Sequence, residues 1–149
     1  MAPFDLAGSW EFEAGACCRV DVEFEPGDAD AVGLDLAVGG GAATRLRWDT
    51  RTGRLALDRA GSGDAGFHPA FASVEAAEVR PRDGVLRLRV LLDRTSVEVF
   101  AAGGEVCLTD QVFPPGGATS ASVVAEGGTA RVVRLEWAEL PTWSEIEPH

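Results

Sequence analysis

The sequence predicts an all-β protein folded as one antiparallel β-sandwich of the jelly-roll or concanavalin-like type. Apolar and polar residues alternate along many short segments, and this two-residue period is typical of strands that bury one face. Turns rich in glycine and proline separate the segments, because glycine readily adopts the positive φ angles of tight turns. A chain of 149 residues fits a single domain and is long enough to enclose a core.

The alternation marks the expected strands in chain order. The clearest pattern runs from Leu86 to Leu92, where leucine and valine occupy one face and Arg87 and Arg89 the other. In residues 20–24, valine and phenylalanine alternate with acidic residues in the same way. We expect strands at 20–24, 34–38, 45–48, 55–57, 86–92, 97–99, 106–108, 122–124 and 132–137.

Turns between these segments predict how the strands connect. Gly103 and Gly104 separate two alternating segments and are expected to close a β-hairpin. The pattern of a helix is weak everywhere, and only residues 70–79 could hold a helical turn or two. Strands at regular intervals with such turns favour an antiparallel sandwich. The other expected turns lie at 26–28, 39–41, 61–63, 83–84, 114–117 and 127–128.

The charge balance argues against nucleic acid as a partner. The formal net charge is −11 and the sequence contains no lysine, so the surface repels phosphate backbones. No apolar run approaches the ~20 residues of a membrane-spanning helix, so no membrane partner is expected. The first residues lack the basic and apolar segments of a signal peptide, and none is expected there. A neutral sugar is indifferent to net charge, so the composition leaves sugars open as ligands.

Neither the cysteines nor the histidines predict a bridge, a metal site or a cofactor. Cys17 and Cys18 are adjacent and would project to opposite faces of a strand, so they are not expected to pair with each other. With Cys107 the count is odd, and buried free thiols are the simplest interpretation. His68 and His149 do not lie near a cysteine pair at the spacing of a metal site.

Several stretches together resemble a known family. Residues 91–100 are LLDRTSVEVF, and residues 105–114, beyond the Gly-Gly turn, are EVCLTDQVFP. The order of these motifs resembles the C-terminal β-sandwich of glycoside hydrolase family 32, which includes invertases, levanases and exo-inulinases. The resemblance covers residues 8–143 and leaves 1–7 and 144–149 as expected tails. Its further motifs are GSWEF at 8–12, DR at 58–59, GSG at 61–63, FHPAFA at 67–72, EGG at 126–128 and LEWAEL at 135–140.

The resemblance implies a hydrolase parent but places the chemistry elsewhere. Family 32 enzymes carry their catalytic acids on a five-bladed β-propeller, in the motifs Asn-Asp-Pro-Asn-Gly, Arg-Asp-Pro and Glu-Cys. None of these motifs occurs in this sequence. The resemblance therefore implies a non-catalytic module whose partner is the propeller of a β-fructosidase. A levanase-type parent would be extracellular and an invertase-like parent cytoplasmic.

The segment 93–98 supplies the first candidate site. Asp93, Arg94 and Glu98 could hydrogen-bond the vicinal hydroxyls of a sugar, because carboxylates accept and guanidinium donates in a fixed fork. The related carbohydrate-binding module family 66 has the same sandwich and holds terminal fructose units of levan, which implies fructan chain ends as a ligand. The alternative is structural: Asp93 and Arg94 pair to close the bend between strands, and Glu98 satisfies a neighbouring arginine.

A second candidate cluster lies at 59–71. Phenylalanine rings could stack on a sugar, and the histidine, arginine and aspartate could bond its hydroxyls. The alternative is that both rings belong to the core and the histidine shapes a loop. Three functions therefore stay open: a stabilising module for the propeller, a fructan-binding module, and a free-standing protein-interaction sandwich. The cluster consists of Arg59, Asp64, Phe67, His68 and Phe71.

Overall fold

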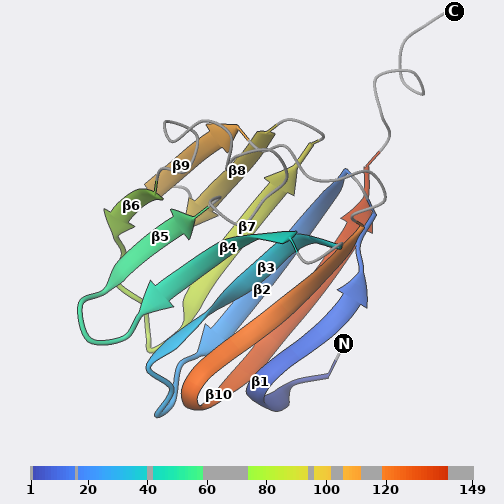
Figure 1. Ribbon diagram of the computed structural model, residues 1–149. Helices are drawn as coiled ribbons and strands as arrows, with labels where there is room; N and C mark the ends of the chain where they lie inside the picture. The colour runs from blue at the N-terminus through green and yellow to red at the C-terminus, as the bar shows by residue number, and fades with distance from the viewer. Residues whose placement is uncertain are drawn as a thin grey trace, which may run out of the picture.

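The computed structural model describes residues 2–15, 17–39, 42–58, 74–93, 96–101, 106–111 and 119–140. These ranges contain no helix, and so none that could span a membrane. The described residues form ten strands (Figure 1). They are β1 (Phe4–Glu13), β2 (Cys18–Glu25), β3 (Ala31–Gly39), β4 (Ala42–Asp49), β5 (Arg54–Asp58), β6 (Val74–Glu78), β7 (Leu86–Leu92), β8 (Ser96–Ala101), β9 (Val106–Gln111) and β10 (Ser120–Glu139).

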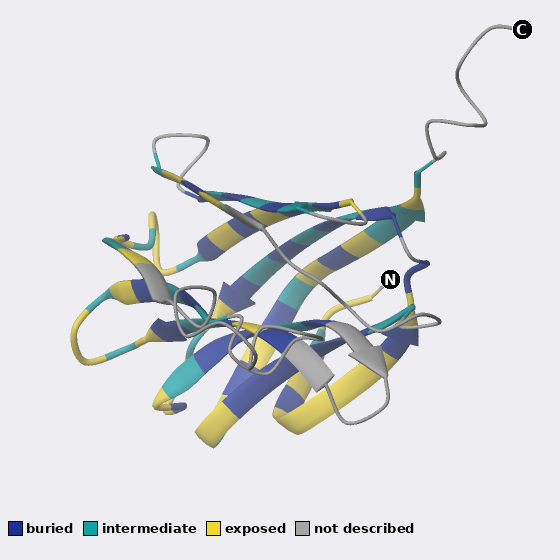
Figure 2. Cartoon of the chain, turned by 45° about the horizontal axis from the view of Figure 1, so that its top comes forward, coloured by how far each residue is buried: buried dark blue, intermediate teal, exposed yellow. Residues whose placement is uncertain are grey.

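The strands form two layers that share β10, as the predicted antiparallel sandwich requires. The hydrogen-bonded order is β6-β5-β4-β3-β10-β2-β7-β8-β9, with β1 paired to β10. The first half of β10 pairs with β3 and its second half with β2. Figure 2 shows the two layers with buried and exposed residues alternating along the strands. The fold class predicted from the sequence is confirmed.

A single strand, β10, replaces the two that the sequence predicts at 122–124 and 132–137. Gly127 and Gly128 have φ angles of 72° and 159°, and the strand bends there without ending. Asp28 anchors the bend, because its Oδ1 accepts a 2.7 Å hydrogen bond from the Thr129 amide. The glycine pair thus redirects β10 from one layer to the other instead of closing a turn.

The core lies between the layers and follows the predicted alternation. Along β7 the residues facing inward are buried, while Arg87 and Arg89 are exposed. Each fully buried aliphatic or aromatic side chain contributes on the order of 1.5–3 kcal/mol, so this face accounts for much of the driving force. The largest fully buried side chains are Phe24, Leu34, Leu36, Leu46, Leu55, Leu57, Leu86, Leu135, Val20, Val22, Val32 and Val79.

Two expectations about local structure are wrong. Residues 74–78 form β6, paired antiparallel to β5, in place of the helical turn that the sequence allowed within 70–79, and residues 70–73 of that window lie outside the described residues. A strand partner along the whole of β5 outweighs the weak helical preference of this alanine- and glutamate-rich segment. Cys107 is exposed, whereas Cys17 and Cys18 are buried free thiols as expected. Cys107 stands opposite Phe100 on the outer face of β9, which explains its exposure.

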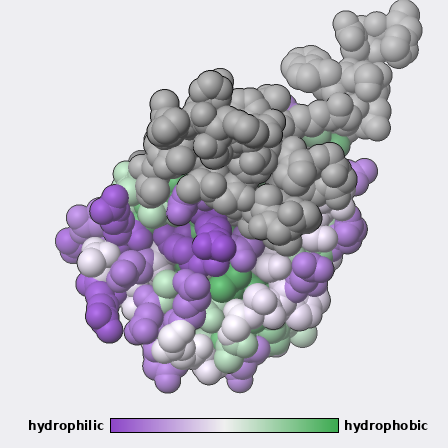
Figure 3. All heavy atoms as spheres, viewed as in Figure 1, coloured by the Kyte–Doolittle hydropathy of each residue, from purple (hydrophilic) through white to green (hydrophobic). Residues whose placement is uncertain are grey.

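The hairpins agree with the sequence where the structure describes them. Asp83 and Gly84 have φ angles of 54° and 75° between the bridged residues Arg82 and Val85, as a tight hairpin turn requires. Strands β8 and β9 pair as the Gly103-Gly104 hairpin predicts, although the turn itself lies outside the described residues. On the face seen in Figure 3, hydrophilic residues gather over the β4–β5 turn and the neighbouring strand ends.

Candidate functional site

The outer face of the layer formed by β10, β2, β7 and β8 carries a patterned set of charges. Residues at odd positions of β2 and β7 point away from the core, because successive side chains of a strand alternate between faces. The register places Asp21 opposite Arg89 and Glu23 opposite Arg87. Acidic side chains of one strand thus stand beside basic side chains of the next, an arrangement that stabilises cross-strand neighbours.

Asp21 and its arginines form the first ion-pair group of this face. The Nε of Arg89 donates a 2.6 Å hydrogen bond to Asp21 Oδ1. The Nε of Arg19 lies 3.1 Å from Asp21 Oδ2. Each carboxylate oxygen of Asp21 therefore faces a guanidinium group, one from β2 and one from β7.

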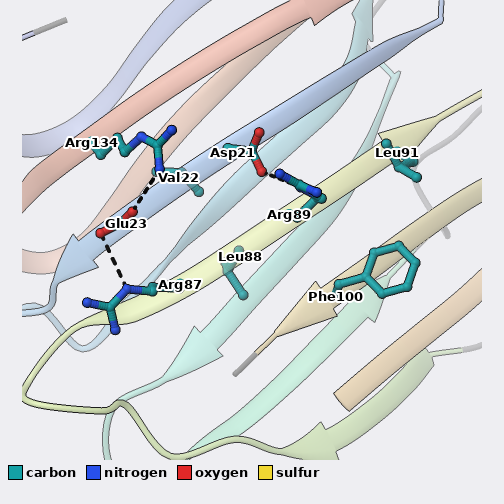
Figure 4. Close-up of a pocket in the computed structure, with 9 residues that line it drawn as sticks. All are labelled: Asp21, Val22, Glu23, Arg87, Leu88, Arg89, Leu91, Phe100 and Arg134. Carbon is teal, nitrogen blue, oxygen red and sulfur yellow. Dashed lines mark hydrogen bonds and ion pairs between the residues drawn. The ribbon is translucent and has the colours of Figure 1, made fainter. Parts of the chain in front are cut away.

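Glu23 forms the second group with arginines on both neighbouring strands. Its Oε1 lies 3.4 Å from Arg87 Nε, and its Oε2 accepts a 3.4 Å hydrogen bond from Arg134 Nη1. Arg134 also donates a 2.8 Å hydrogen bond to Glu136 on its own strand. The bond and charge of Glu136 raise the pKa of Arg134, and the same contact lowers the pKa of Glu136. Figure 4 shows Glu23 bridging the two arginines.

On this face the carboxylates lie close to the sheet, and the arginine side chains extend further into the solvent. The side chains of Asp21 and Glu23 are 15% and 21% exposed, against 57% for Arg89 and 52% for Arg134. Arg89 contacts its carboxylate through Nε, so its remaining N–H donors are on the exposed part of the side chain. Such a rim can donate hydrogen bonds to a molecule resting on the sheet.

An apolar area borders the charges and completes an open groove of about 520 Å³. Leu91 and Phe100 line it beside Arg89, each partly buried, and Phe100 is the cross-strand neighbour of Arg89. In Figure 4 the two apolar side chains lie together at one side of the ion pairs. The groove thus offers an apolar surface and a hydrogen-bonding rim at once, as small-molecule sites commonly do.

The structure describes two of the eight residues predicted as a sugar site. Glu98 projects from β8 opposite Leu91, so it shares the outer face with the groove. Asp93 follows β7, and its amide donates a 2.9 Å hydrogen bond to the Ser96 carbonyl, which closes the bend between β7 and β8. Asp93 Oδ1 also accepts a 3.5 Å contact from the Cys17 thiol. The other predicted residues lie outside the described ranges: Arg94, Arg59, Asp64, Phe67, His68 and Phe71.

The sequence analysis did not select the groove residues, although the pattern held a clue to them. The outward residues of β2 are largely acidic, and those of β7 include Arg87 and Arg89. Two strands of opposite charge pattern attract each other as neighbours. Their contact could therefore have been suggested from the sequence, but β2 and β7 are far apart along the chain.

A second surface feature is an aromatic cluster beside the N-terminal strand. The ring centroids of Phe12 and Trp137 are 4.4 Å apart, and Trp10 lies 5.8 Å from Phe12 and 6.1 Å from Trp137. Phe4 extends the cluster at 5.7 Å from Trp10. Trp10 is 36% exposed and is the large hydrophobic residue most open to solvent among the described residues. This aromatic edge, Phe4, Trp10, Phe12 and Trp137, joins β1 to β10.

The described residues do not assemble a metal centre. They contain no group of three or more histidine, cysteine or acidic side chains placed to hold an ion. The one large thiol effect is in the core, where burial, helped by the neighbouring Cys17 and Glu139, raises the pKa of Cys18 to about 11. The chemistry this surface offers is therefore hydrogen bonding and apolar contact.

Known proteins with matching sequences are enzymes much longer than this chain. The profile of the family described as "Glycosyl hydrolases family 32 C terminal" matches residues 4–139. The levanase of Bacillus subtilis (strain 168) is 32% identical over 126 residues, which cover 83% of this chain and 19% of the levanase. The fructan beta-fructosidase of Streptococcus mutans is 41% identical over 101 residues, covering 67% of this chain and 7% of that protein.

A solved structure agrees with the fold. The crystal structure of exo-inulinase from Aspergillus awamori superimposes with a TM-score of 0.86 and 31% sequence identity. The match covers 95% of this chain and 28% of the exo-inulinase chain. The chain thus spans a quarter or less of the length of these curated relatives, for example 25% of the A. awamori extracellular exo-inulinase.

Proposed function

The chain belongs to the family of glycosyl hydrolase family 32 C-terminal domains, and from this we propose that it is the non-catalytic C-terminal module of a fructan-cleaving β-fructosidase. In family 32 enzymes this domain accompanies a catalytic domain. The observation that carries the proposal is the match of the family profile to residues 4–139, nearly the whole chain, while the matched residues cover only 19% of a relative named levanase and 25% of one named exo-inulinase.

The aromatic edge supports a stabilising role toward the catalytic domain. It lies along β1, the strand nearest the N-terminus, and a C-terminal module is joined to its enzyme on that side (Figure 1). Trp10 leaves 36% of its surface exposed beside the partly buried Phe4 and Trp137. Covering apolar area stabilises by roughly 25 cal/mol per Å², so contact of this edge with the catalytic domain would hold both domains together.

The experiment that tests this proposal uses the complete product of the gene. We expect it to contain a propeller domain before residue 4 and to release fructose from levan or inulin. Removing residues 4–139, or changing Trp10 to Ser, should lower its Tm, and the full deletion should have the larger effect. The isolated chain should release no fructose. Hydrolysis by clean isolated chain, abolished by Asp93→Asn, would contradict the non-catalytic role.

A second candidate function is fructan binding. The open groove beside Leu91 and Phe100 favours it, because the groove combines apolar and hydrogen-bonding surfaces. The predicted contacts Asp93, Arg94 and Glu98 are retained as a separate hypothesis for a chain-end site at the β7–β8 bend. Titration of levan into the wild-type chain and an Arg94→Ala variant tests that hypothesis, and unchanged binding by a well-folded variant would exclude it.

A further inference from the structure

We propose that the outer face of β10, β2, β7 and β8 is a binding site for an internal stretch of a β-fructan chain, distinct from the chain-end site predicted at 93–98. Fructose rings would lie over Phe100 and Leu91, and their hydroxyls would bond to the groups around Asp21 and Glu23. The identity of the sugar rests on the proposed function. The presence of a polyhydroxyl site rests on the groove alone.

The first argument is the division of the groove into an apolar side and a polar side. A sugar ring has a face of C–H groups and a rim of hydroxyls, so it is matched by an aromatic ring next to hydrogen-bonding groups. Phe100 and Leu91 supply the apolar side, and Arg89 stands between them and Asp21 (Figure 4). The volume of about 520 Å³ falls within the ~300–1,000 Å³ of small-molecule sites.

The second argument is the hydrogen-bonding capacity left on the rim. Among the described residues, the hydrogen bond of Arg89 to Asp21 is made by Nε, and the ion pair of Arg87 with Glu23 is likewise closest at Nε. Their terminal N–H groups are therefore available, in the planar fork that suits two neighbouring hydroxyls. The oxygens of Asp21 and Glu23 can each accept more than one hydrogen bond. The rim can thus both donate to and accept from a sugar.

The third argument is charge. The ion-paired groups of the face comprise four arginines and three carboxylates, which nearly cancel. The chain as a whole has a net charge of −11, so this area differs from the rest of the surface. A near-neutral rim suits a neutral polymer. A strongly acidic partner would need a clear excess of arginine, which the face lacks.

The fourth argument is the shape and rigidity of the groove. It is open on the sheet surface and is not a closed cavity, so the proposed ligand need not be a chain end that fits inside a pocket. The ion pairs link side chains from three strands and hold them in place before any ligand arrives. The side chains of the groove therefore lose little conformational entropy when a ligand binds, and this loss weakens binding only slightly.

The test is calorimetric titration of levan and inulin fragments into the 149-residue chain and two matched arginine variants. Arg89→Gln removes a rim donor. Arg80→Gln removes another exposed, ion-paired arginine, which pairs with Glu78 and does not line the groove, and serves as the control. We expect millimolar to micromolar affinity for wild type, about tenfold or more weaker binding for Arg89→Gln, and no change for Arg80→Gln. Dextran should not compete.

A second readout uses the exposed thiol beside the groove. Cys107 is exposed and stands opposite Phe100, whereas Cys17 and Cys18 are buried. A fluorophore attached to Cys107 should therefore report levan binding in the wild type, and Phe100→Ala should abolish that response while the circular dichroism spectrum stays that of a folded β protein.

The outcomes separate this inference from the proposed function. The site is overturned if folded wild type does not bind fructan. It is also overturned if the Arg89→Gln and Phe100→Ala variants bind fructan as tightly as wild type does. Binding lost only in Arg94→Ala overturns it in favour of the chain-end site. Binding of poly-glutamate in place of fructan would show an acidic partner and also overturn it. None of these results alters whether the complete gene product cleaves fructan, which tests the proposed function separately.

Discussion

Arg47 on β4 and Arg89 on β7 both project from the outer face of a layer, yet their guanidinium groups have different surroundings. Arg47 Nη1 donates 3.1 Å hydrogen bonds to the carbonyls of Leu34 and Leu46. Its Nη2 lies 2.8 Å from Asp35 Oδ1, and its Nε donates a 3.1 Å hydrogen bond to Glu126. Its side chain is 21% exposed, against 57% for Arg89.

The comparison teaches how to separate structural arginines from those available to a ligand. Each nitrogen of Arg47 has an oxygen of the protein within 3.1 Å, on β3, β4 or β10, so the side chain holds three strands together as a clamp. Arg89 has one carboxylate contact, at Asp21, and an open groove beside it. An arginine whose nitrogens all face oxygens of the protein therefore has a structural role. An arginine with N–H groups left without such oxygens, beside an aromatic ring, is available to bind a ligand.

The clamp depends on a glycine directly across the register. Gly33 pairs with Arg47, and a Cβ at position 33 would stand 1.8 Å from the backbone oxygen of Leu46. Real atoms do not approach so closely, so only glycine allows β3 and β4 to come together here. The groove side has no such requirement at its paired residues, all of which carry full side chains.

The largest expected effect is that of Gly33→Ala. The new methyl group would collide with backbone and not with a movable side chain, so we expect a loss of more than ~4 kcal/mol in unfolding free energy, or failure to fold. Urea denaturation measures it. Gly84→Ala is the control, because nothing lies within 4 Å of a Cβ at that position although its φ is +75°. Its cost should be about 1 kcal/mol. Equal losses in the two variants would contradict the close packing of the clamp.

Replacing Arg47 and Arg89 in turn compares directly how much each side chain contributes to stability. Arg47→Ala removes charged hydrogen bonds to two carbonyls and leaves Asp35 and Glu126 without their cation, so it should cost about 2–3 kcal/mol. Arg89→Ala removes an exposed pair and should cost below about 1 kcal/mol. Thermal melts of both variants check the order. If Arg89→Ala were the more destabilising change, Arg89 would be structural and the assignment of the groove to a ligand would fail.

The dependence of stability on alkaline pH tests the buried side of β2 separately from its charged outer side. Burial raises the pKa of Cys18 from 9.0 to about 11, so the folded state favours the protonated thiol. This contribution to stability is complete below the unfolded pKa near 9 and is lost as the pH rises towards 11. The loss should be on the order of 1–2 kcal/mol. The sequence has no lysine and no tyrosine, so few other groups titrate in this range.

Variants of the thiols identify the group responsible. Denaturation between pH 9 and 11 should show falling stability in wild type and in Cys107→Ser, whose thiol is exposed. Cys18→Ala should be less stable at pH 8 but nearly flat over the same range. A wild-type slope that persisted in Cys18→Ala would assign the effect to another group.

The sequence predicted the layers better than it predicted the outer surface of one of them. Alternation alone located β2, β7 and β8, because one buried face per strand leaves a clear two-residue period. It missed β1, which buries only Leu6 and Phe12 and so has no regular two-residue period, and β6, where local preference is weak and the partner strand decides. It also divided β10 at Gly127-Gly128, because a glycine pair serves a bend as well as a turn. The groove was missed for a physical reason: Asp21 and Arg89 meet only through the register of strands that are distant in sequence.

The smallest expected effect lies at the far end of the ion-pair groups, on β10. The hydrogen bond and charge of Arg134 lower the pKa of Glu136 below its ordinary value of 4.5. The stabilising contribution of this pair is present above the unfolded pKa and is lost as the pH falls through the lower, folded pKa. Both side chains are about half exposed, so the change in overall stability should be too small to move the Tm.

Carbon-13 NMR of the Glu136 carboxyl group measures this contact directly. We expect a titration midpoint below 4.5 in wild type and a return towards 4.5 in Arg134→Ala, with Glu78 and its partner Arg80 as an exposed reference pair. A midpoint that does not move in Arg134→Ala would mean that the pair is not maintained in solution. Arg134 also holds Glu23, so the rim of the groove would then be mobile at this end, and the low ordering cost that favours a sugar ligand would no longer apply. A shifted midpoint with an unchanged Tm would support an ion-pair set that orders the rim without stabilising the fold.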